Sequence, residues 1–241
     1  MKASLLLSLL ACSAVFAADN CDCTHFPIQP KSCAPVCAAS LLNLAADILA
    51  GAVRNSDNGI PPEVASNAAC VIVVPGIKNS AFVVGGSAGH GFASCREPRR
   101  NGWTAPAAVE IEGGSFGLQI GRSQTDLIIL AMNSRFAQTL GRSKFTLGKD
   151  ASVAAGPVGR TGSAQTDASM ASDLLVYSRT RGAFAGTSIQ GATLRSDEAL
   201  NQGVYGSNVN NRQILDGEIK PPDSASKLQD VLNRSFGARA R

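Results

Sequence analysis

Short strand-like runs, separated by connections rich in glycine and proline, fill the middle of this 241-residue chain and constrain its fold most. Several runs alternate apolar and polar residues, which is the pattern of a half-buried strand. The connections are too short to hold the crossover helix that joins parallel strands. We therefore predict a mainly antiparallel, twisted sheet. The expected strands cover residues 71–74, 81–84, 92–96, 109–112, 116–120, 127–132, 151–155, 174–178 and 183–189.

Helical periodicity appears on both sides of these strands. Expected helices cover residues 41–54, 61–69, 134–140, 197–204 and 223–236. Strands grouped between helices indicate an α+β fold, and no long linker or repeat divides the chain, so we expect a single compact domain with flanking N- and C-terminal helices. The expected organisation is a signal peptide (1–17), a cysteine-rich segment (18–40), the main domain (41–216), and a C-terminal helix and tail (217–241).

The first residues have the composition of an export signal. Lys2 precedes an apolar stretch over residues 3–10, and small residues around Ala17 suit cleavage there. This predicts a secreted or periplasmic protein. A second interpretation stays open, because residues 9–12 resemble a lipoprotein box that would place a lipid anchor on Cys12.

Six cysteines remain after cleavage, and an even number in an exported chain favours disulfides. Cys70 and Cys95 each lie at the end of an expected strand, so we expect them to join neighbouring strands. The other four lie close together in the N-terminal segment, and their pairing is open: Cys21, Cys23, Cys33 and Cys37. A zinc site built from these thiolates and His25 is the rival interpretation, but an oxidising compartment favours disulfides, so we expect no metal.

Charge and motifs exclude several functions. A formal net charge of +4 is too small for the basic surface of a nucleic-acid-binding protein. Ser87 and Ser115 lie in G-x-S-x-G segments, the pattern of a hydrolase nucleophile. The catalytic histidine of such enzymes follows the acid in the chain, whereas no histidine follows Ser115 and His90 lies only three residues after Ser87. We expect no catalysis and no cofactor.

Ordered motifs anchored by glycine and proline resemble the SYLF domain, also described as the actin-binding domain of a yeast cortical actin-patch protein. They include Ile-Pro-Pro at 60–62, Val-Gly-Gly at 84–86, Gly-His-Gly at 89–91, the glycine-rich 113–121, Gly-Pro-Val-Gly-Arg at 156–160, Tyr-Ser-Arg at 177–179 and Tyr-Gly at 205–206. Their order and spacing match over about residues 41–216.

The resemblance implies a non-enzymatic lipid-binding module, with phosphoinositides as the usual ligands of eukaryotic members. Some members also bundle actin, but export would separate this chain from cytosolic actin. Family members use a basic N-terminal helix for lipid contact, whereas the helix expected over 41–54 has Arg54 as its one cation. We therefore expect anionic phospholipid head groups as the ligand and do not expect actin binding.

Head-group contact needs cations, arginine above all, beside an aromatic side chain able to enter the interface. The best local match is a basic turn just before the single tryptophan. The expected lipid-binding residues are Lys78, Arg96, Arg99, Arg100, Trp103, Arg160, Arg179 and Arg181. The alternatives are that Trp103 packs in the core and that Arg160 and Arg179 bond loop carbonyls. The alternative function is a structural or protein-interaction module of the cell envelope.

Overall fold

The computed structural model describes residues 34–55, 57–79, 87–97, 101–116, 125–141, 144–159, 172–180, 183–186 and 189–237. Its strands are β1 (Cys70–Asn79), β2 (Ser87–Cys95), β3 (Ala107–Phe116), β4 (Thr125–Ala131), β5 (Phe145–Thr146), β6 (Val153–Ala155), β7 (Leu174–Thr180), β8 (Ala183–Gly186) and β9 (Ile189–Ser196). Its helices are α1 (Ala34–Arg54), α2 (Pro62–Asn67), α3 (Phe136–Leu140), α5 (Glu198–Tyr205), α6 (Asn211–Leu215), the 3-10 turn η3 (Asp223–Ala225) and α7 (Ser226–Ser235).

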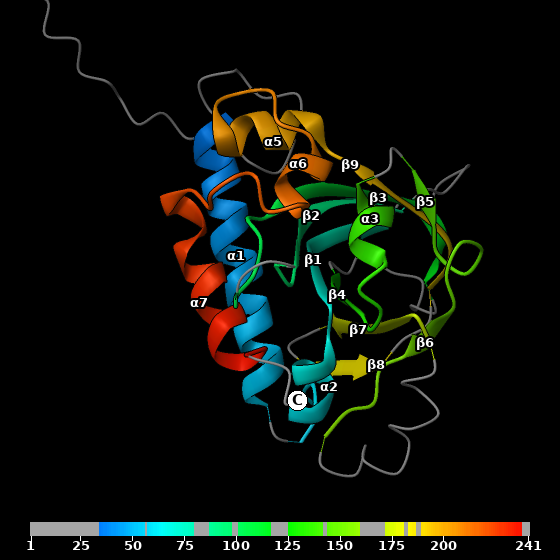
Figure 1. The fold of residues 1–241 in the computed structure, drawn as a ribbon. Helices are drawn as coiled ribbons and strands as arrows, with labels where there is room; N and C mark the ends of the chain where they lie inside the picture. The colour runs from blue at the N-terminus through cyan, green and yellow to red at the C-terminus, as the bar shows by residue number, and fades with distance from the viewer. Residues whose placement is uncertain are drawn as a thin grey trace, which may run out of the picture.

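One curled sheet of nine strands organises the fold (Figure 1). The strand order is β5-β9-β3-β2-β1-β4-β7-β6, and β8 pairs with β7. Within the described strands, β6 and β7 pair in parallel and the remaining ladders are antiparallel. The predicted α+β class with a mainly antiparallel sheet is confirmed.

The central strands are buried on both faces of the sheet. In β4, Ile128 and Leu130 belong to the cluster that includes the buried face of α1, whereas Leu127 and Ile129 belong to a second cluster on the other face. Because successive strand residues point to opposite faces, a continuous apolar run is what a strand covered on both sides requires. The strand expected over residues 127–132 is therefore β4, a central strand covered on both faces.

Helix α1 is longer than predicted and begins within the cysteine-rich segment, at Ala34. Pro35 suits the first turn of a helix, where its missing N–H costs nothing. The predicted apolar face is buried, including Ile48 and Leu49. By length and composition α1 is apolar enough to cross a membrane, but its buried face packs against the sheet and α7. The predicted leader over residues 1–17 lies outside the described residues.

Several predicted strands differ from the structure. The strands expected separately over 109–112 and 116–120 are not separate at Phe116, because β3 runs from Ala107 to Phe116, and residues 117–120 lie outside the described residues. The single strand predicted over 183–189 is two strands, β8 and β9, and β9 continues to Ser196. Gly191 has φ +74°, a left-handed conformation within β9, although the pairing with β3 continues in one register on both sides of it. Ala192 and Leu194 therefore face the same core cluster as Ile189, three residues before Ala192. This irregularity breaks the two-residue period, which explains why the sequence pattern concealed β9. The strand predicted over 81–84 lies outside the described residues.

The disulfide between Cys70 and Cys95 joins β1 to β2, as predicted. The two residues are direct cross-strand neighbours, and both side chains are buried. Cys37, on α1, is also disulfide-bonded. The predicted involvement of Cys21, Cys23 and Cys33 concerns residues outside the described part of the chain.

Replacing both Cys70 and Cys95 with alanine is expected to lower the free energy of unfolding by about 3 kcal/mol. The bond closes a loop with a sequence separation of 25, and the unfolded chain regains the corresponding entropy when the bond is absent. Urea denaturation of the oxidised variant beside the oxidised parent measures the difference. A loss below about 1 kcal/mol would contradict the expectation.

Candidate functional site

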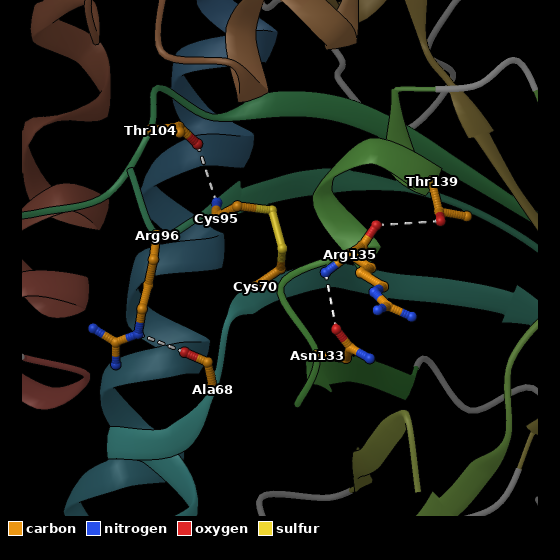
Figure 2. Close-up of a disulfide and its surroundings, with 8 residues drawn as sticks. All are labelled: Ala68, Cys70, Cys95, Arg96, Thr104, Asn133, Arg135 and Thr139. Carbon is orange, nitrogen blue, oxygen red and sulfur yellow. Dashed lines mark hydrogen bonds between the residues drawn. A yellow bond between two sulfur atoms is a disulfide. The ribbon is translucent and has the colours of Figure 1, made fainter. Parts of the chain in front are cut away.

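Arg96, predicted to meet phosphate, directs its guanidinium toward backbone carbonyl oxygens. Nε donates to Ala68 O, Nη1 to Gly237 O, and Nη2 to Ser66 O and Phe236 O, each at 2.8 Å. Figure 2 shows Arg96 beside the Cys70–Cys95 disulfide, with Nε aimed at the carbonyl of Ala68. Arg96 therefore joins the end of β2 to the end of α2 and to the C-terminal end of the described chain.

Trp103 is a packing residue in this structure, with 5% of its surface exposed. Its ring meets Phe236 edge to face, with centroids 6.1 Å apart. The Arg96 guanidinium lies over the same ring, 4.9 Å from its centroid, in a cation–π contact. This burial favours the packing alternative for Trp103 over insertion into a membrane.

The residues on either side of Arg99 and Arg100 in the chain are bonded to each other. Arg96 and Trp103 form an antiparallel bridge, and the backbone N–H of Glu97 donates to Gly102 O at 3.0 Å. Thr104 adds a hydrogen bond from its backbone N–H to Cys95 O, and its Oγ1 accepts from the N–H of Cys95. Arg99 and Arg100 themselves lie outside the described residues, so their predicted role stays a prediction.

Arg179 pairs with a carboxylate. Its Nε donates to Asp126 Oδ2 at 2.7 Å, and its guanidinium lies 5.5 Å from the centre of the Phe184 ring. Asp126 also accepts from the N–H of Gly76 at 2.9 Å. Arg179 thus joins β7 to β4 and lies far along the sheet from Arg96, so the structure does not bring these two predicted residues together.

The other predicted contacts are not placed by the structure. Lys78 lies in β1 opposite Ala88, and only its backbone is described. Arg160 and Arg181 lie outside the described residues.

Sequence reasoning missed a cluster of charged side chains on β2, β3 and β9. His90 is the cross-strand neighbour of Glu110, which is the neighbour of Arg195. His90 Nδ1 lies 2.7 Å from Asp197 Oδ2. Arg195 donates to Glu110 at 3.0 Å and to Glu112 at 2.8 Å. The alternation of Glu110 and Glu112 was visible in the sequence, but the irregular β9 concealed their partners.

Burial and charge act against each other on these groups. Burial alone lowers the pKa of His90, but the hydrogen bond and charge of Asp197, with the charge of Glu110, outweigh it, so the pKa of His90 is raised. Burial is also the main cause that raises the pKa of Glu110, although His90 and Arg195 oppose it. The cluster therefore favours positive charge at its centre.

Buried amides hold α5 and α6 against β3, next to this cluster. Asn201 Oδ1 accepts from the N–H of Ala108 at 2.9 Å, and Asn211 Nδ2 donates to Ala108 O at 2.9 Å. The two amide side chains also bond to each other at 2.7 Å. Because every partner is buried and bonded, the network positions Asp197, which caps α5 by accepting from the N–H of Leu200.

The two serines of the G-x-S-x-G segments lie in antiparallel strands. Ser87 begins β2 opposite Asn79, and Ser115 lies in β3 opposite Gln190. A hydrolase nucleophile needs a sharp turn between a strand and a helix, and neither serine has this setting.

Comparisons with known proteins identify the family. A family model described as "Las17-binding protein actin regulator", Ysc84, matches residues 112–235. An SH3 domain-containing protein of Schizosaccharomyces pombe is 34% identical over 177 residues, which cover 72% of this chain and 41% of the relative. LAS seventeen-binding protein 3 of Saccharomyces cerevisiae is 32% identical over 204 residues, which cover 81% of this chain and 44% of the relative.

A vertebrate relative gives the same result. SH3 domain-containing YSC84-like protein 1 of Xenopus laevis is 32% identical over 179 residues, which cover 73% of this chain and 53% of that protein. The chain thus spans about half the length of the curated relatives it matches. Since the family model covers more than half of this chain and these relatives are more than 30% identical over more than two thirds of it, the chain belongs to the Ysc84 family, that of the SYLF domain.

Proposed function

We propose that this domain binds anionic phospholipid head groups without catalysis. The head groups would be bound by arginines in two chain segments that the Arg96 side chain holds together. The main support is the position of Arg96. Its guanidinium donates to the carbonyls of Phe236 and Gly237, and its backbone forms a bridge with Trp103. The segment between Arg96 and Trp103 and the segment that follows Gly237 are therefore both anchored at Arg96.

Both segments are basic. The first holds Arg99 and Arg100, and Arg239 and Arg241 follow Gly237 within four residues. Because consecutive Cα atoms are about 3.8 Å apart, the Cα of Arg239 lies within about 7.6 Å of the Cα of Gly237. Four arginines therefore lie in sequence within four residues of positions that are bonded to Arg96 or that form its bridge. Each cation near an anionic surface contributes about 1 kcal/mol, so binding should be modest and sensitive to salt. Lys78, Arg160, Arg179 and Arg181 are secondary candidates in this proposal.

We also propose that the protein is exported. Disulfides persist in oxidising compartments, and the Cys70–Cys95 bond is buried within the sheet. The ligand would then be met on an extracellular or envelope membrane, or after entry into another cell.

Replacing Arg99 and Arg100 with glutamine tests the head-group proposal. The oxidised, leader-free protein is pelleted with phosphatidylcholine vesicles, alone or mixed with phosphatidylserine or a phosphoinositide at matched charge. We expect the parent to bind both anionic vesicles, less so at high salt. At about 1 kcal/mol per cation, the double variant should bind about 30-fold more weakly.

A second double variant, Lys149→Gln with Arg212→Gln, is the matched control. It removes the same charge from exposed positions, and α6, which carries Arg212, lies at the opposite end of the molecule from α2, whose last residues Arg96 contacts (Figure 1). It should bind within about threefold of the parent. Equal pelleting with neutral and anionic vesicles, or equal losses in the two double variants, would refute the proposal.

The family description favours a protein partner as the second candidate function. It names Las17 binding and actin regulation. Co-sedimentation with filamentous actin, run on the same parent and variants, distinguishes the two functions. Pelleting with actin together with no pelleting with anionic vesicles would favour the protein-binding function and overturn our expectation that actin is not a partner.

A further inference from the structure

The cluster around His90 combines three metal-ligating side chains from separate elements. His90 comes from β2, Glu110 from β3, and Asp197 from the junction of β9 and α5. One ligand atom from each lies within 4.8 Å of the other two. The side chains are half-buried or buried, with His90 22%, Glu110 19% and Asp197 6% exposed. His90 and Glu110 are cross-strand partners in the sheet, and Asp197 is the N-cap of α5.

The charges of the cluster call for a cation. Three carboxylates, those of Glu110, Glu112 and Asp197, meet one permanent cation, the guanidinium of Arg195, and the His90 imidazole, which is positive only when it holds a second proton. Arg195 already divides its donors between Glu110 and Glu112. It can therefore keep Glu112 as its partner when Glu110 turns toward His90.

We propose that His90, Glu110 and Asp197 bind a divalent cation of the Zn²⁺ class. One imidazole nitrogen with two carboxylate oxygens suits zinc and its neighbours, whereas Mg²⁺ and Ca²⁺ prefer ligand sets made of oxygen alone. Bonds of about 2.0–2.2 Å place the ligand atoms of a tetrahedral site about 3.3–3.6 Å apart, so ligand atoms that now lie within 4.8 Å of one another would need to approach by at most about 1.5 Å. Three protein ligands leave the fourth position for water.

Hydrogen bonding around the site orients one ligand in advance. Asp197 Oδ1 accepts from the N–H of Leu200 at 2.9 Å, which fixes the carboxylate and leaves Oδ2 directed at His90. Such outer bonds commonly set the orientation of metal ligands. A bound cation would therefore join β2, β3 and the start of α5, and would stabilise the folded state by mass action.

Titration of the leader-free, oxidised protein with zinc chloride tests the site, after dialysis against a chelator. Calorimetry should show one saturable site per chain with no comparable heat from Mg²⁺ or Ca²⁺, and zinc should raise the melting temperature. His90→Gln and Glu110→Gln should each weaken zinc binding more than about tenfold. Loss of a residue that only hydrogen-bonds to a metal ligand already costs about tenfold or more in affinity, and loss of the ligand itself should cost more. Glutamine preserves a hydrogen-bonding side chain at both positions.

Two further variants separate ligand loss from charge loss. Glu63→Gln removes the same charge as Glu110→Gln from an exposed position on α2, outside the cluster, and should change the affinity by less than about threefold. Arg195→Gln frees Glu110 and should tighten binding. No saturable zinc binding by the parent, or unchanged binding in both ligand variants, would overturn the proposal. Vesicle binding is independent of this result, so the two proposals fail separately.

Discussion

Replacing Arg96 with alanine is expected to lower the free energy of unfolding by about 3 kcal/mol. The guanidinium donates to the carbonyls of Ser66, Ala68, Phe236 and Gly237, all at 2.8 Å. Removing a charged donor loses strong bonds and leaves partly buried acceptors without partners. The cation–π contact with Trp103 is lost as well. Urea denaturation followed by circular dichroism measures the change.

Two companion variants interpret this result. Arg96→Lys should recover only part of the loss, because an ammonium group cannot present the planar set of donors that these carbonyls meet. Arg212→Ala should change stability by less than about 0.5 kcal/mol, since its side chain is 81% exposed and pairs weakly with Asp216. If Arg96→Ala is as stable as Arg212→Ala, the hydrogen bonds from Arg96 to the four carbonyls do not stabilise the fold.

Much of the fold could be predicted from local patterns. Runs of β-branched residues located the central strands, and the shortness of the connections implied antiparallel pairing. The start of α2 at Pro62 follows from the preference of proline for the first helical turn. These features depend on neighbours in sequence, which is why the residues alone reveal them.

The roles of the site residues depend on distant partners and could not be predicted in the same way. Arg96 looked like a free cation, but its carbonyl partners lie between 28 and 141 residues away. Asp197 reaches His90 across 107 residues, through a strand whose irregular period concealed it. Composition shows that a charge is present, whereas the fold decides what it meets.

Gly91→Ala is expected to destabilise the protein by more than about 3 kcal/mol. An added Cβ would lie 2.1 Å from Val73 O and 2.7 Å from the Cα of Val74. These are backbone atoms of β1, so no side-chain rotation relieves the overlap and two paired strands must separate. Since whole domains are stable by only about 5–15 kcal/mol, soluble yield and the urea midpoint should both fall sharply.

Gly51→Ala is the matched control, because the same methyl group should there have the opposite effect. Gly51 lies inside α1, and its added Cβ would meet nothing closer than 3.9 Å. Alanine in a helix interior is favoured over glycine by about 1 kcal/mol, so this variant should be slightly more stable than the parent. Equal stabilities of the two variants would mean that the approach of β2 to β1 is looser than described. A large difference would mean that the second glycine of the Gly-His-Gly motif is needed for the close approach of the β2 backbone to the β1 backbone. The histidine between the two glycines is directed at Asp197.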